Sequence, residues 1–273
     1  MLGKRTLVAA IIIPLALGAI YVGGYLYQAL IILLLAAAAW EYTRLLKKIN
    51  LDTPLLLILG GVVILGAVRA LFDFNYLASV LSALIMLAAA YHIFDYERRD
   101  THPAVDFGAT LSILFYIGFL GPYLISLRGL ENGRWWTFIV LPTVWIADTA
   151  AYLIGSAWGK HKLAPKTSPH KTWEGYFAGV AAGVISSPLL ILLFNRFFQA
   201  GIAITFLEGA VLGLAIAAFI PLGDLTESMI KRQAAEKDSG SILPGHGGIF
   251  DRLDSLFWAA PIGYYLILHL FLQ

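Results

Sequence analysis

Long apolar runs separated by short polar segments cover almost the whole chain. A helix needs about 20 mostly apolar residues to cross the hydrocarbon core of a bilayer. Nine stretches approach or exceed this length, and they are residues 6–24, 28–46, 54–71, 76–94, 105–127, 135–158, 173–198, 202–230 and 253–272. The pattern therefore predicts an all-α, polytopic integral membrane protein with about nine transmembrane helices.

The first apolar run follows Lys4 and Arg5, an arrangement that secretory signal peptides share. The apolar region of a signal peptide covers only about 7 to 15 residues. Because this run is longer and leads almost directly into the second one, the sequence favours a retained helix over a cleaved signal.

Composition supports a membrane protein and excludes several other classes. Hydrophobic residues make up 59% of the 273 residues and charged residues 13%, against about 25% charged residues in an ordinary globular protein. A net charge of +2 lacks the basic excess of nucleic-acid-binding proteins. The absence of cysteine excludes disulfides, zinc–thiolate sites, iron–sulfur clusters and thiol catalysis.

The distribution of Lys and Arg predicts the orientation in the membrane, because cytoplasmic loops are enriched in these residues. With the N-terminus in the cytoplasm, 15 of the 19 basic residues lie on the cytoplasmic side, and the other four are Arg69, Arg128, Arg134 and Arg196. The sequence therefore predicts an inner (plasma) membrane protein whose polar segments 159–172 and 232–250 face the cytoplasm.

Glycines recur at helical spacing within two of the apolar runs. Gly175, Gly179 and Gly183 follow one another every fourth residue, as do Gly209 and Gly213. Small residues at this spacing let helix backbones approach closely in lipid, so we expect these glycines to mark tight helix contacts.

Carboxylates inside a membrane are costly, which makes them candidate functional groups. The candidates are Asp148, Glu174, Asp224, Glu227, Asp251 and Asp254, which lie within or beside the later apolar runs, all in the second half of the chain. We therefore expect residues 1–130, with about five spans, to form a scaffold and dimerisation region, and residues 131–273 to carry the catalytic site.

A polar stripe is predicted on the eighth span. Asp224, Glu227, Ser228 and Lys231 share one helix face because they lie three, four and seven residues apart. A stripe of this kind is too costly to face lipid, and it is expected to line a cavity or to meet another polar helix. A structural ion pair between Glu227 and Lys231 is an alternative, but it leaves Asp224 and Ser228 unexplained.

Glycines also punctuate the loop that follows the stripe, just ahead of a predicted helix start. Backbone N–H groups at such a position bind anions, so phosphate is the expected ligand. Asp251 and Asp254 would repel a bare phosphate, and a divalent cation such as Mg²⁺ between carboxylates and phosphate would resolve the conflict. A plain turn with an Asp helix cap is the alternative for this loop taken alone.

The other polar loop, 159–172, is basic. Basic side chains at a cytoplasmic surface attract anionic headgroups. The enrichment of Lys and Arg on the cytoplasmic side is enough to explain Lys160 and Lys162. Lys166 and Lys171, which lie close to Glu174 in the sequence, are candidate phosphate ligands.

Residues 228–254 read S-x-x-K-R-x(4)-K-D-x-G-x(2)-L-P-x-H-G-G-x-x-D-R-x-D. This segment resembles the signature of the CDP-diacylglycerol synthases, also called phosphatidate cytidylyltransferases. The similarity extends to residues 169–175, to Asp148 with Thr149, and to Gly223 with Asp224. The first five spans carry no motif of this family.

The resemblance implies that CTP and phosphatidic acid react to give CDP-diacylglycerol and pyrophosphate, with Mg²⁺ and a second cation such as K⁺. The metal-binding residues that it implies are Asp224 and Asp251, supported by Asp254 and Asp148. The residues expected to face the phosphates during catalysis are Lys231, Arg232, Lys237 and Arg252, beside the two main carboxylates. The further substrate-binding candidates are Lys166, Lys171, Glu174, Ser228, Asp238, His246, Gly247 and Gly248.

Other function classes fit the sequence less well. The CDP-alcohol phosphotransferases have a motif that begins with Asp-Gly, a pair that this sequence lacks. A transporter of an anionic substrate tends to place broken helices in both halves, whereas the first four spans here are nearly free of charge. Another membrane-embedded phospho- or nucleotidyltransferase remains an alternative function. For the oligomeric state, a homodimer is the expectation.

Overall fold

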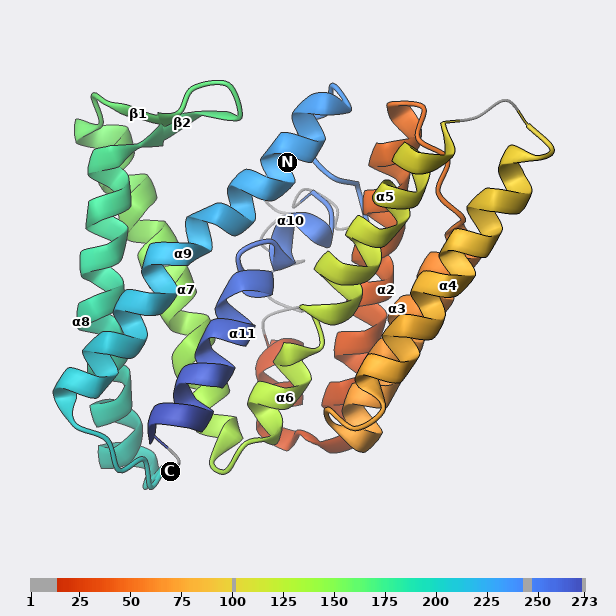
Figure 1. Ribbon diagram of the computed structural model, residues 1–273. Helices are drawn as coiled ribbons and strands as arrows, with labels where there is room; N and C mark the ends of the chain where they lie inside the picture. Colours follow the sequence, from red (N-terminus) through yellow and green to blue (C-terminus); the bar gives the residue numbers. More distant parts are fainter. Residues whose placement is uncertain (1–13, 100–101, 243–246, 272–273) are drawn as a thin grey trace. The chain divides into compact units, whose positions relative to one another are not determined.

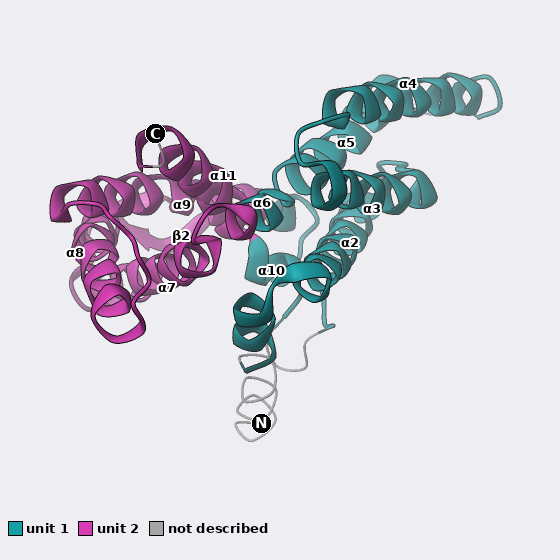
Figure 2. Cartoon of the chain, turned by 90° about the horizontal axis from the view of Figure 1, so that it is seen from below, with its two compact units in different colours: residues 1–126, 230–253 teal, residues 127–229, 254–273 magenta. Residues whose placement is uncertain are grey.

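The computed structural model describes residues 14–99, 102–242 and 247–271, which are almost entirely helical (Figure 1). The chain divides into two compact units (Figure 2). Unit 1 comprises residues 1–126 and 230–253, and unit 2 comprises residues 127–229 and 254–273. One boundary between the units, at residues 126 and 127, thus lies near the one expected at residue 130. Two further boundaries assign residues 230–253 to a different unit from the residues before and after them. Which half serves as scaffold and which as catalytic region stays a prediction.

Unit 1 is built from helices of the first half of the chain together with the end of α9 and the short α10. Its elements are α2 (Gly24–Lys48), α3 (Leu55–Phe72), α4 (Leu77–Tyr96), α5 (Pro103–Ile113), the π-helix η1 (Leu114–Phe119), the start of α6 (Tyr123–Gly129) and α10 (Phe250–Leu253). Leu65, Leu77, Leu84 and Leu114 form a core cluster. Gly61 allows the close approach, because a Cβ there would lie 2.7 Å from Leu114 Cδ2.

Unit 2 contains the remaining helices and a small hairpin. Its elements are the end of α6, α7 (Gly133–Trp158), β1 (Lys162–Ala164), β2 (Ser168–Thr172), α8 (Trp173–Phe198), most of α9 (Phe206–Gln233), α11 (Leu256–Leu266) and the π-helix η2 (Ile267–Phe271). The segment expected as a polar loop is therefore an antiparallel hairpin, and it joins the ends of α7 and α8 (Figure 1). The Thr172 hydroxyl caps α8 by accepting a hydrogen bond from the Gly175 N–H at 3.2 Å.

The glycine spacing marks close helix contacts in unit 2, as the sequence predicted. A Cβ at Gly175 would lie 2.6 Å from the Ala151 carbonyl oxygen, and one at Gly179 would lie 2.9 Å from that of Ala147, so both glycines face α7. A Cβ at Gly213 of α9 would overlap the carbonyl group of Gly183 in α8. The missing side chains therefore let α8 pack directly against the backbones of two helices.

Seven helical segments among the described residues are long and apolar enough to cross a membrane, and each overlaps an expected span. They are Gly24–Lys48, Leu55–Phe72, Leu77–Tyr96, Pro103–Gly129, Gly133–Trp158, Trp173–Phe198 and Phe206–Gln233. The first expected span lies partly outside the described residues, although 14–22 are helical. The ninth is shorter than expected because a break at 254–255 separates α10 from α11. The all-α polytopic class is confirmed, whereas the count of nine and the orientation stay predictions.

Candidate active site

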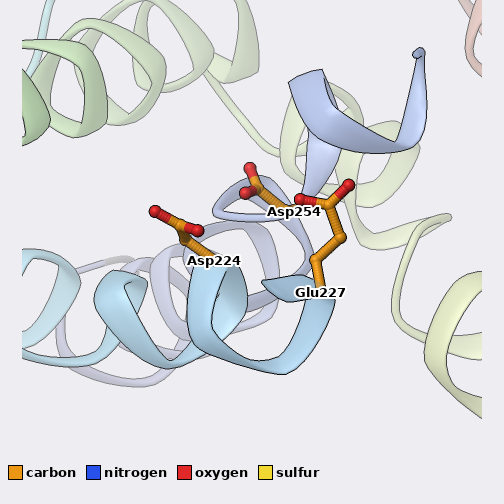
Figure 3. Close-up of side chains that lie close together, drawn as sticks. All are labelled: Asp224, Glu227 and Asp254. Carbon is orange, nitrogen blue, oxygen red and sulfur yellow. The ribbon is translucent and has the colours of Figure 1, made fainter. Parts of the chain in front are cut away.

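Three carboxylates come together in unit 2. Asp224 and Glu227 lie one turn apart on α9, and Asp254 follows α10 (Figure 3). Each offers one oxygen atom, and these atoms all lie within 4.8 Å of one another. Glu227 is buried, and the other two are half-buried. We call this set the acidic group. Carboxylates so close together repel one another, and a cation among them relieves the repulsion.

Gly223 explains how Asp254 comes so close to α9. A Cβ at Gly223 would overlap the Asp254 carbonyl oxygen and would lie 3.0 Å from Cδ1 of Trp258. The glycine beside Asp224 in the sequence is thus needed for space, and it brings the segment after α10 against the helix that carries the other two carboxylates.

Residues from β2, from α7 and from α9 itself surround Asp224. The Lys171 ammonium lies 2.8 Å from Asp224 Oδ2, and the Ser228 hydroxyl donates to Asp224 Oδ1 at 3.1 Å. Asp148, on α7, is hydrogen-bonded to Ser255 and lies near enough to Lys171 and Asp224 for their charges to act on it. Unit 2 therefore assembles Asp148, Lys171, Ser228 and Asp224, which the sequence predicted as site residues from four separate positions.

Glu174 and Lys166 have different surroundings from Lys171. The Glu174 carboxylate accepts a hydrogen bond from the His161 N–H at 3.2 Å and lies 2.6 Å from His161 Nδ1. It thus fastens the start of the hairpin to the first turn of α8. Lys166 lies exposed in the turn between β1 and β2. A role for either residue in substrate binding stays a prediction.

Asp251 lies in unit 1, where donors of the protein surround its carboxylate. Oδ1 lies 2.6 Å from the Lys231 ammonium. Oδ2 accepts hydrogen bonds from the N–H groups of Ser239 at 2.9 Å and Gly248 at 2.8 Å. The side chains of Asp251 and Lys231 are only 9% and 10% exposed. Asp251 is therefore organised as the centre of a hydrogen-bonded loop, and its role as a metal ligand stays a prediction.

The loop that contains these donors is residues 237–250, here called the signature loop, of which 243–246, including His246, lie outside the described residues. The N–H groups of Ser239 and Gly248 donate to Asp251, and the Phe250 N–H donates to Glu41 at 2.9 Å. Gly247 has a φ of 79°, a conformation that favours glycine. Three of the N–H groups expected to face a phosphate are thus bound to carboxylates of the protein.

A basic pocket opens at the start of the signature loop. Its volume is about 270 Å³, and it is lined by Arg44, Leu45, Lys48, Glu236, Lys237, Asp238, Ser239, Gly240 and Ser241. The pocket has three cationic side chains and two carboxylates, so its lining has a net charge of about +1. Lys48 forms an ion pair with Glu236. The predicted residues Lys237 and Asp238 line the pocket, whereas Arg44 and Lys48 were not expected.

The two remaining basic candidates lie at the protein surface in unit 1. Arg232 Nη1 donates to the Glu236 carbonyl oxygen at 3.0 Å, and Arg232 and Arg252 are both exposed. Their expected contacts with phosphate stay predictions.

The expectation that buried carboxylates occur only in the second half of the chain is wrong. Glu41 of α2 is fully buried, and so, nearly, is Asp106 of α5 at 3% exposure. Arg69 is also buried, with its guanidinium 4.4 Å from the centre of the Tyr123 ring. The sequence did contain a signal for Glu41, because it is a single carboxylate inside the apolar run 28–46. The role of Glu41 depends on which distant segment of the chain it contacts.

Comparisons with known proteins identify the relatives of this chain. Residues 3–271 match the family model described as the cytidylyltransferase family. A phosphatidate cytidylyltransferase of Bacillus subtilis is 32% identical over 91% of each chain. Another, of Pseudomonas aeruginosa, is 35% identical over 96% of this chain and 95% of its own. One of Brucella suis is 43% identical over 55% of this chain and 54% of its own. Because the family match covers nearly every residue, including the acidic group and the signature loop, this chain belongs to the cytidylyltransferase family.

Proposed function

We propose that this integral membrane protein transfers the cytidylyl group of CTP to phosphatidic acid, giving CDP-diacylglycerol and pyrophosphate. The family match over residues 3–271 carries the proposal. The acidic group with Lys171, and the basic pocket beside Asp251, supply the groups that a reaction between two polyanions needs. A transporter has no comparable support from the residues or from the relatives.

The acidic group suits a divalent cation. Asp224, Glu227 and Asp254 form an oxygen-only donor set. Hard cations such as Mg²⁺ take ligands of this kind, together with phosphate oxygens and water. We propose Mg²⁺ at this group, with Asp148 as a further carboxylate of the same unit, and we propose Asp251 as a carboxylate for a second cation such as K⁺. When bound, the metal supplies positive charge that neutralises and aligns phosphate oxygens.

The residues of the chain have binding and neutralising roles in this proposal. A phosphate monoester has a second pKa of about 6, so the lipid phosphate is largely deprotonated at neutral pH and needs no dedicated base. Its oxygen forms a bond to the α-phosphorus of CTP as the bond from that phosphorus to the β-phosphate oxygen breaks. Lys171 and Lys231 reduce the repulsion between the two reactants, and Arg232 and Arg252 are further candidates for contacts with the phosphates.

The basic pocket suits the triphosphate of the nucleotide. Arg44, Lys48 and Lys237 supply cations, and Ser239 and Ser241 supply hydroxyl donors. Glu236 and Asp238 line the same pocket, and they disfavour an additional negative charge at their own positions. We infer that the phosphates lie along its cationic side.

The charge distribution and the bacterial relatives support a proposal for where the site lies in the cell. Fifteen of the 19 Lys and Arg residues lie on one side when the N-terminus is cytoplasmic. We propose that the chain lies in the plasma membrane and that its site faces the cytoplasm, where a soluble nucleotide meets a lipid headgroup. A homodimer remains the expected assembly.

Product analysis tests the proposed reaction. Purified protein is incubated with phosphatidic acid, Mg²⁺ and each of the four nucleoside triphosphates in turn, and the liponucleotide and pyrophosphate are measured. We expect both products with CTP, in equal amounts, and none once the divalent cation is chelated. Equal products with every nucleotide, or pyrophosphate without liponucleotide, would contradict the proposal.

A further inference from the structure

Glu41 is a buried carboxylate that the proposed reaction leaves without a role. It lies on the membrane-spanning helix α2 and has no solvent exposure. Burying a carboxylate is costly unless it is well bound, and in a membrane protein such a residue is retained for a reason beyond packing.

Both ends of the signature loop are bound to this one carboxylate. Glu41 Oε2 accepts a hydrogen bond from the Phe250 N–H at 2.9 Å and lies 3.0 Å from the Ser239 hydroxyl. Oε1 has no hydrogen-bond partner among the described residues. Phe250 also stacks on Tyr42, the next residue of α2, with ring centres 5.2 Å apart. The loop is therefore anchored on α2 by contacts with Glu41 and its neighbour.

Two glycines of the loop make room for the same side chain. A Cβ at Gly240 would overlap Glu41 Oε1 and would lie 2.7 Å from its carboxyl carbon. A Cβ at Gly248 would overlap Glu41 Oε2. Neither residue is among the glycines with positive φ, so space, not backbone conformation, requires glycine at both positions.

Ser239 connects Glu41 to the groups with proposed roles in the reaction. Its Oγ lies 3.0 Å from Glu41 Oε2 and 3.0 Å from Asp251 Oδ2, and its N–H donates to Asp251. Asp251 in turn holds Lys231 at 2.6 Å. Ser239 and Gly240 also line the basic pocket. A chain of contacts therefore links Glu41, through Ser239, to Asp251 and Lys231 and to the residues that line the pocket.

We propose that Glu41 is a positioning residue for nucleotidyl transfer, which fixes the signature loop on α2 and thereby sets the positions of Ser239, Asp251 and Lys231. The inference rests on the proposed function. It differs from a role in stability alone, because a positioning residue affects turnover more than it affects folding.

Kinetics of three variants separate positioning from packing. Glu41→Ala removes the anchor, Glu41→Gln keeps an oxygen acceptor for the Phe250 N–H, and Thr43→Val is the matched control. Thr43 is also buried on α2, and its hydroxyl donates a hydrogen bond to the Ala39 carbonyl oxygen of the same helix at 2.8 Å. We expect kcat to fall at least ~10-fold in Glu41→Ala, to recover to within ~3-fold of the unchanged protein in Glu41→Gln, and to change less than ~2-fold in Thr43→Val.

Melting temperatures in detergent accompany these measurements. We expect similar values for Glu41→Ala and Thr43→Val despite their different kcat. Equal kcat in those two variants would overturn the proposal, as would a loss in Glu41→Ala with no recovery in Glu41→Gln. Absence of liponucleotide formation by the unchanged protein would instead overturn the proposed function.

A second test uses the contact with Gly240 and does not depend on Glu41→Ala folding. Gly240→Ala is expected to lower kcat at least ~10-fold, because the new methyl group meets Glu41. Combining it with Glu41→Asp, which shortens the side chain by one methylene, should restore kcat by at least ~3-fold over Gly240→Ala alone, a non-additive result expected of residues in contact. Additive losses in the double variant would show that the glycine does not serve the Glu41 contact.

Discussion

Asp224 and Asp251, the two main carboxylates proposed for cation binding, have different surroundings. Asp224 is half-buried, lies with Glu227 and Asp254 in the acidic group, and has Lys171 at 2.8 Å. Asp251 is bound by the Lys231 ammonium and by two N–H groups of the signature loop. Asp224 lies beside other carboxylates, an arrangement typical of cation ligands. Asp251 is the hydrogen-bonded centre of a loop. Substitution of Asp224 and substitution of Asp251 should therefore affect the stability of the protein differently.

Asp224→Asn should lower kcat at least ~100-fold while the protein remains folded, because it removes one charge from the acidic group without changing the shape of the side chain. Turnover is measured over a Mg²⁺ titration, and melting in detergent monitors the fold. Thr226→Val, on the same helix but with its hydroxyl bonded to the Leu222 carbonyl, should retain activity. Near-normal turnover of Asp224→Asn at ordinary Mg²⁺ would remove the metal assignment from this group.

Asp251→Asn should abolish turnover and also destabilise the protein. The amide loses the ion pair with Lys231 and one acceptor for the loop, which costs ~1–3 kcal/mol for a hydrogen bond to a charged group. A lowered melting temperature together with lost activity is the expected pair of results. Activity retained in the purified variant would show that Asp251 neither binds a cation nor orders the loop for the reaction.

Arg44→Ala should raise the KM for CTP ~10-fold and leave the KM for phosphatidic acid within ~2-fold, because only the nucleotide is proposed to enter the basic pocket. Lys47→Ala is the control, since Lys47 is exposed on the same helix but does not line the pocket. A raised KM for phosphatidic acid with that for CTP unchanged would assign the pocket to the lipid phosphate.

Helices in unit 2 contact one another through glycines, and the sequence spacing revealed which ones. Gly175 and Gly179 of α8 face carbonyl groups of α7, and Gly213 of α9 faces the Gly183 carbonyl of α8. In lipid, apolar side chains gain little by meeting one another instead of lipid tails, so close packing of backbones contributes much of the association. These contacts hold in place α7 and α9, the helices that carry Asp148 and Asp224.

Gly213→Ala should destabilise the protein by ~1–3 kcal/mol, the usual cost of overpacking, because the new methyl group meets a backbone carbonyl that has no rotamer to change. Gly108→Ala is the matched control, since a Cβ at that helical glycine would have no atom of the described residues within 4 Å beyond its own stretch of helix backbone, and it should be neutral or stabilising. The melting temperatures of the Gly213→Ala and Gly108→Ala variants are compared by thermal unfolding in the same detergent. Equal melting temperatures would show that α8 and α9 adjust their spacing freely.

The whole chain is an integral membrane protein in which seven helices are long and apolar enough to span a bilayer among the described residues. Its two units each combine segments that are distant in the sequence. Residues 230–253, which hold most of the signature, pack with the N-terminal helices in unit 1, so the first half of the chain supports the loop that contains Asp251.

Orientation is testable because the chain has no cysteine of its own. Single variants Lys47→Cys and Arg196→Cys introduce thiols at exposed positions. With the N-terminus cytoplasmic, a membrane-impermeant maleimide should label Arg196→Cys in right-side-out vesicles and Lys47→Cys only in inverted ones. The opposite labelling pattern would reverse the proposed orientation and place the site outside.

The sequence by itself determined the membrane class, seven of the helices, the glycine contacts of α8 and the family, because apolar run length, helical spacing and motif are local properties of the chain. It also indicated Asp224 and Asp251 as the main metal-binding carboxylates, supported by Asp254 and Asp148, whereas the structure groups Asp224 with Glu227 and Asp254. Only the tertiary structure decided that Glu227 completes the acidic group, that Lys171 turns to Asp224 while Glu174 turns to His161, and that Glu41 meets Ser239, 198 residues later. The physical reason is that an apolar pattern defines a helix and its lipid-facing surface, whereas the partner of a buried polar side chain depends on which distant segment packs beside it.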